Sequence, residues 1–130
     1  MNSIAAPILA AEAVTAAQVL PARRTVSVVM VVYMTGEALE RSLACVLADP
    51  LVDQLVVVDN GSTPPEAERL RALAAGDRRV VLKTGHGNIG FARGANLGAA
   101  TASGELLVFL NPDAFLQPGC VAALAREVEG

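Results

Sequence analysis

Short polar side chains follow three apolar segments of this sequence and could carry its chemistry. One apolar run ends at Tyr33 in "VVYMTG", a second leads into Asp59 and Asn60 in "VVDNGS", and another leads into Asn111 and Asp113 in "LNPD". Carboxylates and amides hydrogen-bond nucleobases and sugars, and a single carboxylate suits Mg²⁺ or Mn²⁺ held mainly by a diphosphate and water. Together these residues predict one binding site for a polar ligand.

The two acids each allow a second interpretation. Pro112 restricts the backbone on either side of it, so Asp113 stands at a rigid point where it could ligate a metal ion or form an Asx turn. Asp59 could bind a nucleobase or ribose together with Asn60, or it could simply shape the turn "DNGS". The residues alone leave these alternatives open.

A literal G-x-G-x-x-G lies at Gly85, Gly87 and Gly90. This string is the fingerprint of a dinucleotide-binding turn, which normally opens the first strand–helix unit of a fold. Here it opens the third unit, and an acid-bearing turn already ends the second strand. We therefore interpret the string as coincidental and keep an NAD- or FAD-binding oxidoreductase as the alternative. We place His86 on the loop surface.

Four strand-like segments alternate with four helix-like segments. The predicted strands are Thr25–Tyr33, Gln54–Asp59, Arg79–Thr84 and Gly104–Leu110, and the predicted helices are Gly36–Ala48, Pro65–Ala75, Phe91–Ala102 and a last one that buries Val121, Leu124, Ala125 and Val128. This alternation predicts a doubly wound α/β fold with a mainly parallel sheet of order 3-2-1-4 and helices on both faces. Ligands bind such sheets beyond the carboxyl ends of the strands, where the polar residues lie.

The helix predicted from Phe91 is unusually rich in small residues, among them Gly94 and Gly98. Glycine lets another chain segment or a ligand approach a helix closely. The same stretch also carries the polar residues Arg93 and Asn96.

The composition describes one globular domain of 130 residues, with 53% hydrophobic residues and a net charge of −3. The absence of a long basic cluster argues against nucleic acid as a partner. The longest apolar stretch, Val26–Met34, is too short for a membrane helix, which needs about 20 residues. Cys45 and Cys120 lack C-x-x-C spacing and are expected to be small buried thiols without a disulfide.

Residues 1–24 form an Ala-rich extension, and residues 25–130 form the domain. The extension lacks a basic start, and Glu12 interrupts its apolar part, so it is not expected to be a secretory signal. We expect a cytoplasmic protein that works in solution or at the inner face of the membrane.

Four blocks, "VSVVMVVY", "LVVVDNGS", "GNIGFARGANLGAA" and "GELLVFLNPD", resemble in their order and spacing the nucleotide-binding half of family 2 glycosyltransferases. The resemblance covers nearly all of Thr25–Gly130, and its "NPD" form is similar to that of rhamnosyl- and galactofuranosyl-transferring members. It implies a GT-A fold and an inverting hexosyltransferase that uses a dTDP- or UDP-sugar. The acceptor would be a saccharide or another hydroxyl compound in polysaccharide or cell-envelope glycan synthesis.

The resemblance also implies roles for individual residues. The residues expected to bind the donor nucleotide are Tyr33, Asp59, Asn60, Asn88, Gly90, Arg93, Asn96 and Asn111. Arg93 is the only cation of its block and could contact the diphosphate or the base, or lie on the helix surface. "NPD" corresponds to the family's D-x-D motif, so Asp113 would ligate Mg²⁺ or Mn²⁺, and Asn111 replaces the first acid.

Three departures from the family pattern qualify these expectations. Met34 stands where a polar residue is common, Pro64 stands where an acid is common, and the sequence ends at Gly130. Family members continue into an acceptor-binding half that contains the general base, and neither Glu127 nor Glu129 is placed to take that role. We therefore expect this chain alone not to transfer sugar. A nucleotide-binding fragment without activity is a third interpretation.

Overall fold

The computed structural model describes residues 23–129, in which four strands alternate with four helices. In chain order the elements are β1 (Val26–Tyr33), α1 (Ala38–Ala48), β2 (Gln54–Gly61), α2 (Pro64–Gly76), β3 (Val80–Lys83), α3 (Phe91–Thr101), β4 (Leu106–Phe109) and α4 (Cys120–Glu129). All eight predicted elements are confirmed, with ends that differ by at most two residues where the prediction gave both ends. The Ala-rich extension predicted over residues 1–24 lies almost wholly outside the described part of the chain.

The sheet has the order β3-β2-β1-β4, and each neighbouring pair is parallel, which confirms the predicted topology. The central strand is β1, where Val29 lies opposite Val56 of β2 and Phe109 of β4. Six of its eight residues, from Val26 to Met30 and Val32, are buried. Burial on both faces explains why the strand is an almost unbroken apolar run.

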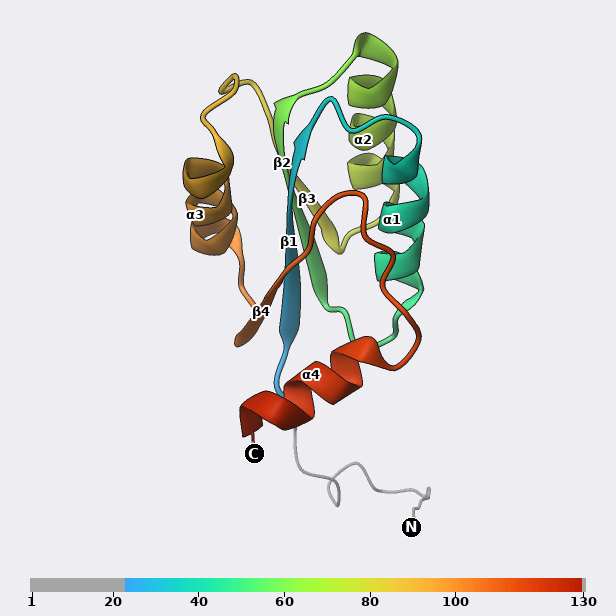
Figure 1. Ribbon diagram of the computed structural model, residues 1–130, viewed down its shortest axis with the longest axis vertical. Coiled ribbons are helices and arrows are strands. Elements are labelled where there is room, and N and C mark those ends of the chain that lie inside the picture. The colour runs from blue at the N-terminus through green and yellow to red at the C-terminus, as the bar shows by residue number, and fades with distance from the viewer. Residues whose placement is uncertain (1–22, 130) are drawn as a thin grey trace.

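Helices cover both faces of the sheet, as predicted (Figure 1). Side chains of β1 alternate between the two faces, so Val28 and Met30 join the core with α1, α2 and α4. Val29 and Val58 belong to a smaller core on the opposite face, where Leu97 of α3 packs against them. The parallel strands end at one common edge, here called the carboxyl edge, and α4 lies near the opposite, amino edge (Figure 1).

The small residues of α3 serve packing between this helix and the sheet. A Cβ on Gly98 would overlap the side chain of Val29, and one on Gly94 would come 3.0 Å from Cγ1 of Val31. Both glycines are buried. The sequence predicts that these glycines allow the close approach of either a chain segment or a ligand. The structure shows the close approach of a chain segment, β1.

The expected buried face of the last helix is wrong for most of its members. Val121 is buried, but Leu124 is 42% exposed and Val128 is 63% exposed. The neighbouring edge strand β4 likewise exposes Leu107 and Phe109. A groove of about 330 Å³ runs between β4 and α4. Helical spacing shows which side chains share a face, but it does not show whether another element covers that face.

Two further predictions concern the cysteines and membrane-spanning helices. Cys45 and Cys120 are both free thiols, as expected, but each is only half-buried. In residues 23–129 we find no helix whose length and apolar character would let it cross a membrane.

The packing of α3 predicts opposite effects of two glycine-to-alanine changes in helices. Gly98→Ala forces a methyl group into Val29 and should destabilise the fold by about 1–3 kcal/mol, less the gain of roughly 1 kcal/mol in helix propensity. Gly76→Ala is the matched control, because nothing lies within 4 Å of its Cβ position, and it should leave stability unchanged or raised. Thermal and urea unfolding measure both. Equal stability of the two variants would show that α3 does not need a glycine at this contact.

Candidate functional site

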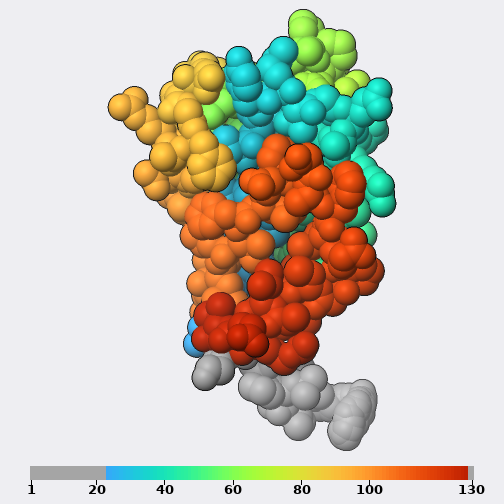
Figure 2. Space-filling view, viewed as in Figure 1, coloured from blue at the N-terminus to red at the C-terminus, as the bar shows by residue number. Residues whose placement is uncertain are grey.

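The predicted site residues lie at the ends of β1 and β2, in the loops that leave the carboxyl edge and in the first turns of α3. Tyr33 is the last residue of β1, Asp59 lies two residues before the end of β2, and Asn88 lies in the loop between β3 and α3. The strand β4 stops opposite Val29, four residues before β1 ends, which is about 13 Å along a strand. The segment that follows β4 therefore rises over β1 from a lower level, and it lies on the molecular surface (Figure 2).

Asp59 forms a turn with its own neighbours. It is only 6% exposed, and its Oδ1 accepts hydrogen bonds from the Gly61 N–H at 3.0 Å and the Ser62 hydroxyl at 2.7 Å. Its Oδ2 has one longer contact, 3.4 Å from the Thr84 hydroxyl. Asp59 thus shapes the turn, which is one of its two predicted roles. Its Oδ2 has more capacity than Oδ1 for an additional hydrogen bond.

Asn60 fastens the glycine loop to β2. It is 3% exposed, its Nδ2 donates to the Gly90 carbonyl at 2.9 Å, and its Oδ1 lies 3.0 Å from Nε2 of His86. Its contact with a nucleoside stays a prediction, while its contacts within the protein position the loop. His86, expected on the loop surface, is half-buried, and its contact with Asn60 helps to hold the loop against β2. No sequence signal links residues that lie 26 positions apart in this way.

The glycine loop uses its glycines for backbone conformation. Gly85, Gly87 and Gly90 have φ values of +90°, +72° and +86°, a region that favours glycine. In a dinucleotide fingerprint the third glycine lets the helix pack closely on the strand. A Cβ on Gly90 would meet nothing within 4 Å, and the loop follows β3, which is separated from the β1–β4 reversal point by β2. This geometry supports our interpretation of the string as coincidental.

The start of α3 presents groups that a phosphate could contact. Its N-cap is Gly90, and no side chain caps the first turn, so backbone N–H groups there keep their capacity to donate. Arg93 and Asn96 are exposed, and neither forms a side-chain hydrogen bond or ion pair with the described residues. Asn88, also exposed, accepts a hydrogen bond from the Gly90 N–H at 3.0 Å.

The "NPD" segment ends in an exposed carboxylate. The Asn111 carbonyl accepts from the Ala114 N–H at 3.0 Å, and this backbone turn leaves Asp113 pointing outward without a hydrogen-bond partner in residues 23–129. In the same residues no three His, Cys, Asp or Glu side chains are grouped to hold a metal ion. An exposed single carboxylate fits a cation that a diphosphate and water mainly coordinate.

Two carboxylates with shifted pKa values lie at the amino edge. A bidentate hydrogen bond from Arg23, at 2.8 and 3.0 Å, holds the pKa of Asp53 below its ordinary value. Hydrogen bonds from Arg79 lower the pKa of Asp77 in the same way. Asp53 and Asp77 precede β2 and β3, so the two pairs belong to the scaffold rather than to the candidate site.

Residues 27–130 match the family described as glycosyl transferase family 2. The chain belongs to this family. The match includes every predicted site residue, so the geometry described above is that of a family 2 domain.

Three known proteins are similar to this chain in sequence or in fold. The chain is 27% identical to glycosyltransferase GlyG of Streptococcus pneumoniae over 105 residues, 80% of this chain and 35% of the relative. It superimposes on mannosyltransferase PcManGT of Pyrobaculum calidifontis, solved with GDP-Man and Mn²⁺, with a TM-score of 0.66 and 27% identity, covering 83% of this chain and 32% of the other.

The third relative, TarS of S. aureus in complex with UDP-GlcNAc, gives a TM-score of 0.69 at 17% identity and shows the shared fold alone. That likeness covers 81% of this chain and 31% of the other. This family 2 chain thus spans about a third of the length of each of these three proteins.

The contacts of Asn60 predict what its removal does. Asn60→Ala deletes two hydrogen bonds to the glycine loop and leaves the Gly90 carbonyl and the His86 ring without these partners. It should therefore destabilise the protein by about 1–3 kcal/mol. Amide hydrogen exchange of residues 85–90 should become faster. Asn88→Ala, on the exposed side of the loop, should change stability by less than about 1 kcal/mol. Unchanged exchange in Asn60→Ala would contradict the fastening role.

Proposed function

We propose that this chain is the donor-binding part of an inverting glycosyltransferase that uses a nucleoside-diphosphate sugar. The observation that carries the proposal is the family 2 match over residues 27–130, which contain the whole carboxyl edge of the sheet. GDP-Man and UDP-GlcNAc in the two related structures support a nucleotide-sugar donor. Our expectation from the sequence is a UDP- or dTDP-sugar of the hexose type, including rhamnose.

We assign some residues of the carboxyl edge to the nucleoside of such a donor and others to its diphosphate and sugar. Tyr33 is 58% exposed beside the buried Asp59 turn, and we assign the nucleoside to this side. We assign the diphosphate to the first turn of α3, where Arg93 supplies a positive charge and backbone N–H groups can donate. Asn88 and Asn96 are exposed polar groups suited to the sugar or ribose hydroxyls.

We assign the divalent cation, Mg²⁺ or Mn²⁺, to Asp113. The exposed carboxylate, which has no hydrogen-bond partner among the described residues, supports this role, as does the Mn²⁺ in the PcManGT structure. Asn111 can add an amide oxygen at the same turn. When bound, such a cation offsets the negative charge that develops on the departing diphosphate.

The acceptor side is assigned to no residue of this chain. Glu127 is exposed on α4, beside the groove near the amino edge, and is therefore remote from the donor site. We propose that the donor-binding part alone binds nucleotide without transferring sugar. The acceptor we propose is a saccharide or another hydroxyl compound of a cell-envelope glycan, met in the cytoplasm or at the inner membrane face.

The metal assignment predicts the effect of Asp113→Asn. An amide keeps the volume and the turn but cannot offset the charge of a cation, so the gain in UDP affinity caused by Mn²⁺ should largely disappear. Glu127→Gln is the matched control, an exposed carboxylate changed in the same way at the other end of the molecule. Calorimetric titration with UDP, with and without Mn²⁺, measures both, and thermal unfolding checks folding.

The same experiment can contradict the assignment. If Asp113→Asn gains as much affinity from Mn²⁺ as the unmodified chain, Asp113 does not ligate the metal ion. If Mn²⁺ changes the UDP affinity of none of the three proteins, the metal-dependent part of the proposed function is wrong.

A further inference from the structure

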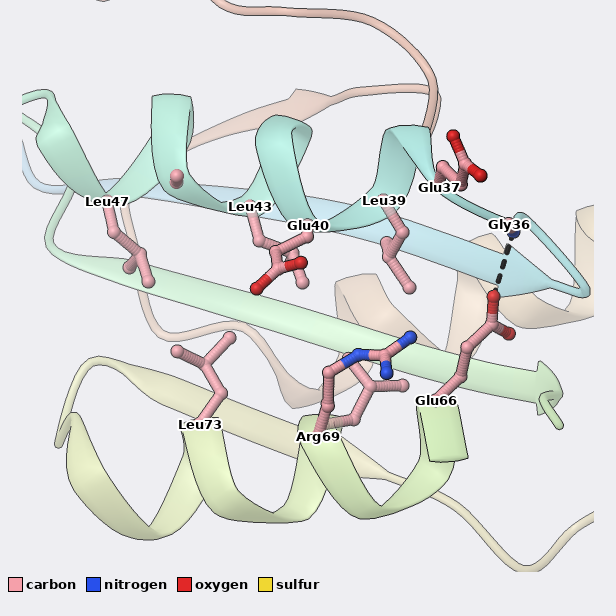
Figure 3. A pocket seen from close by; sticks show the side chains of 11 residues that line it. Gly36, Glu37, Leu39, Glu40, Leu43, Leu47, Glu66, Arg69 and Leu73 are labelled. Carbon is pink, nitrogen blue, oxygen red and sulfur yellow. Dashed lines mark hydrogen bonds between the residues drawn. The ribbon is translucent and has the colours of Figure 1, made fainter. Parts of the chain in front are cut away.

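Glu66 is a buried carboxylate at the start of α2 that does not serve its own helix. It is 5% exposed, and with Thr63 it forms the sequence pattern of a capping box, S/T-x-x-E. Only half of that box forms. The Thr63 hydroxyl accepts a hydrogen bond from the Glu66 N–H at 3.4 Å, but the Glu66 carboxylate does not return to the Thr63 N–H. The Glu66 carboxylate turns away, and its Oε2 accepts a hydrogen bond from the Gly36 N–H at 2.9 Å (Figure 3).

The loop that Glu66 holds, Met34–Glu37 between β1 and α1, has an unusual backbone. Met34 has a φ of +46° and Gly36 has a φ of +87°. A left-handed conformation at a residue other than glycine costs roughly 1–2 kcal/mol, so surrounding contacts must maintain it. Two hydrogen bonds do so, one from the Met34 N–H to the Gly61 carbonyl at 2.7 Å and the other from Gly36 to Glu66.

This loop borders the nucleoside side of the candidate site. Met34 is 53% exposed and directly follows Tyr33, whose ring lies against Gly61 so closely that a Cβ there would be 2.9 Å from two ring carbons. The loop is therefore joined directly to the residue whose ring lies against the turn formed by Asp59.

The surroundings of Glu66 argue against a purely stabilising role. Its second oxygen, Oε1, is buried and has no hydrogen-bond partner among the described residues, and the hydroxyl of Thr35 in the held loop is in the same state. A buried carboxylate with unused hydrogen-bonding capacity lowers stability. Glu66 lies at one end of the groove between α1 and α2, whose walls are largely leucine, with Arg69 and Glu40 alongside (Figure 3).

We propose that Glu66 is a positioning residue for the donor site. Its carboxylate anchors the β1–α1 loop through Gly36, and the anchored loop holds Tyr33 in the place that receives the nucleoside. This inference rests on the proposed function, since the nucleoside end of the donor is assigned to that side of the carboxyl edge.

The chain offers a direct reporter, because Tyr33 is its only tyrosine and it has no tryptophan. Tyrosine fluorescence of the full chain therefore reports on Tyr33 alone, the residue that directly precedes this loop. Acrylamide quenching of the emission can be compared among the unmodified chain, Glu66→Gln and Glu66→Leu, with Glu68→Leu as an exposed control on the same helix. The UDP affinity and thermal unfolding of each protein complete the measurement.

Glutamine can still accept the hydrogen bond from Gly36, whereas leucine fills the volume without accepting it. We expect Glu66→Leu to stay folded, to show stronger quenching of Tyr33 and to bind UDP about fivefold or more weakly, in keeping with the loss of one hydrogen bond to a charged group. Glu66→Gln and Glu68→Leu should resemble the unmodified chain. If Glu66→Leu does not fold, Glu66→Asp, which keeps the charge but shortens the reach, should show the same two changes.

Unchanged quenching or unchanged UDP affinity in the folded variant that lacks the Gly36 contact would overturn the inference while leaving the proposed function intact. Equal weakening by Glu66→Gln would overturn it too, because the hydrogen bond would then not be the cause. An unmodified chain that binds no UDP would instead overturn the proposed function, and with it the donor-site role of Glu66.

Discussion

The burial of β1 on both faces is the constraint on which the rest of this structure depends. A strand with apolar side chains on both sides must be covered by helices from both sides. The right-handed connection from β3 to β4 meets this need, because α3 crosses the face that α1 and α2 leave open. Gly94 and Gly98 let α3 lie directly on the valines of that face. The same crossing puts β4 beside β1 and delivers the "NPD" segment to the carboxyl edge.

The polar residues at that edge fall into two groups with different physical roles. Asp59 and Asn60 are buried, and their hydrogen bonds connect the end of β2 to the loops around it. Arg93, Asn96 and Asp113 are exposed, and their side chains form no hydrogen bond or ion pair with residues 23–129. Buried polar groups that bond to one another fix loop positions, and exposed groups remain for a ligand. The donor site that we propose for this family 2 chain therefore combines buried residues that fix its loops with exposed side chains that are available to a ligand.

Much of this architecture follows from sequence periodicity, and the exceptions have physical causes. The buried valine runs and their alternation with helical segments are sufficient for the sheet order 3-2-1-4, because few connections satisfy right-handed crossovers. Leu124 and Val128 are exposed, contrary to expectation, because helical spacing carries no information about which element packs against a face. The contacts of Asn60 with His86, and of Glu66 with Gly36, join residues 26 and 30 positions apart. Such contacts depend on loop geometry that no local pattern encodes.

We propose that the carboxyl edge, rather than the literal glycine fingerprint, marks a site for nucleoside diphosphates. The most direct test is an NMR titration of the ¹⁵N-labelled chain with UDP or dTDP in the presence of Mg²⁺, set against NAD. The account predicts saturable shifts in the amides of residues 33–36, 59–62, 88–96 and 111–113, with weaker or no binding of NAD. Tighter binding of NAD, or shifts from the nucleoside diphosphates confined to the amino edge, would contradict it.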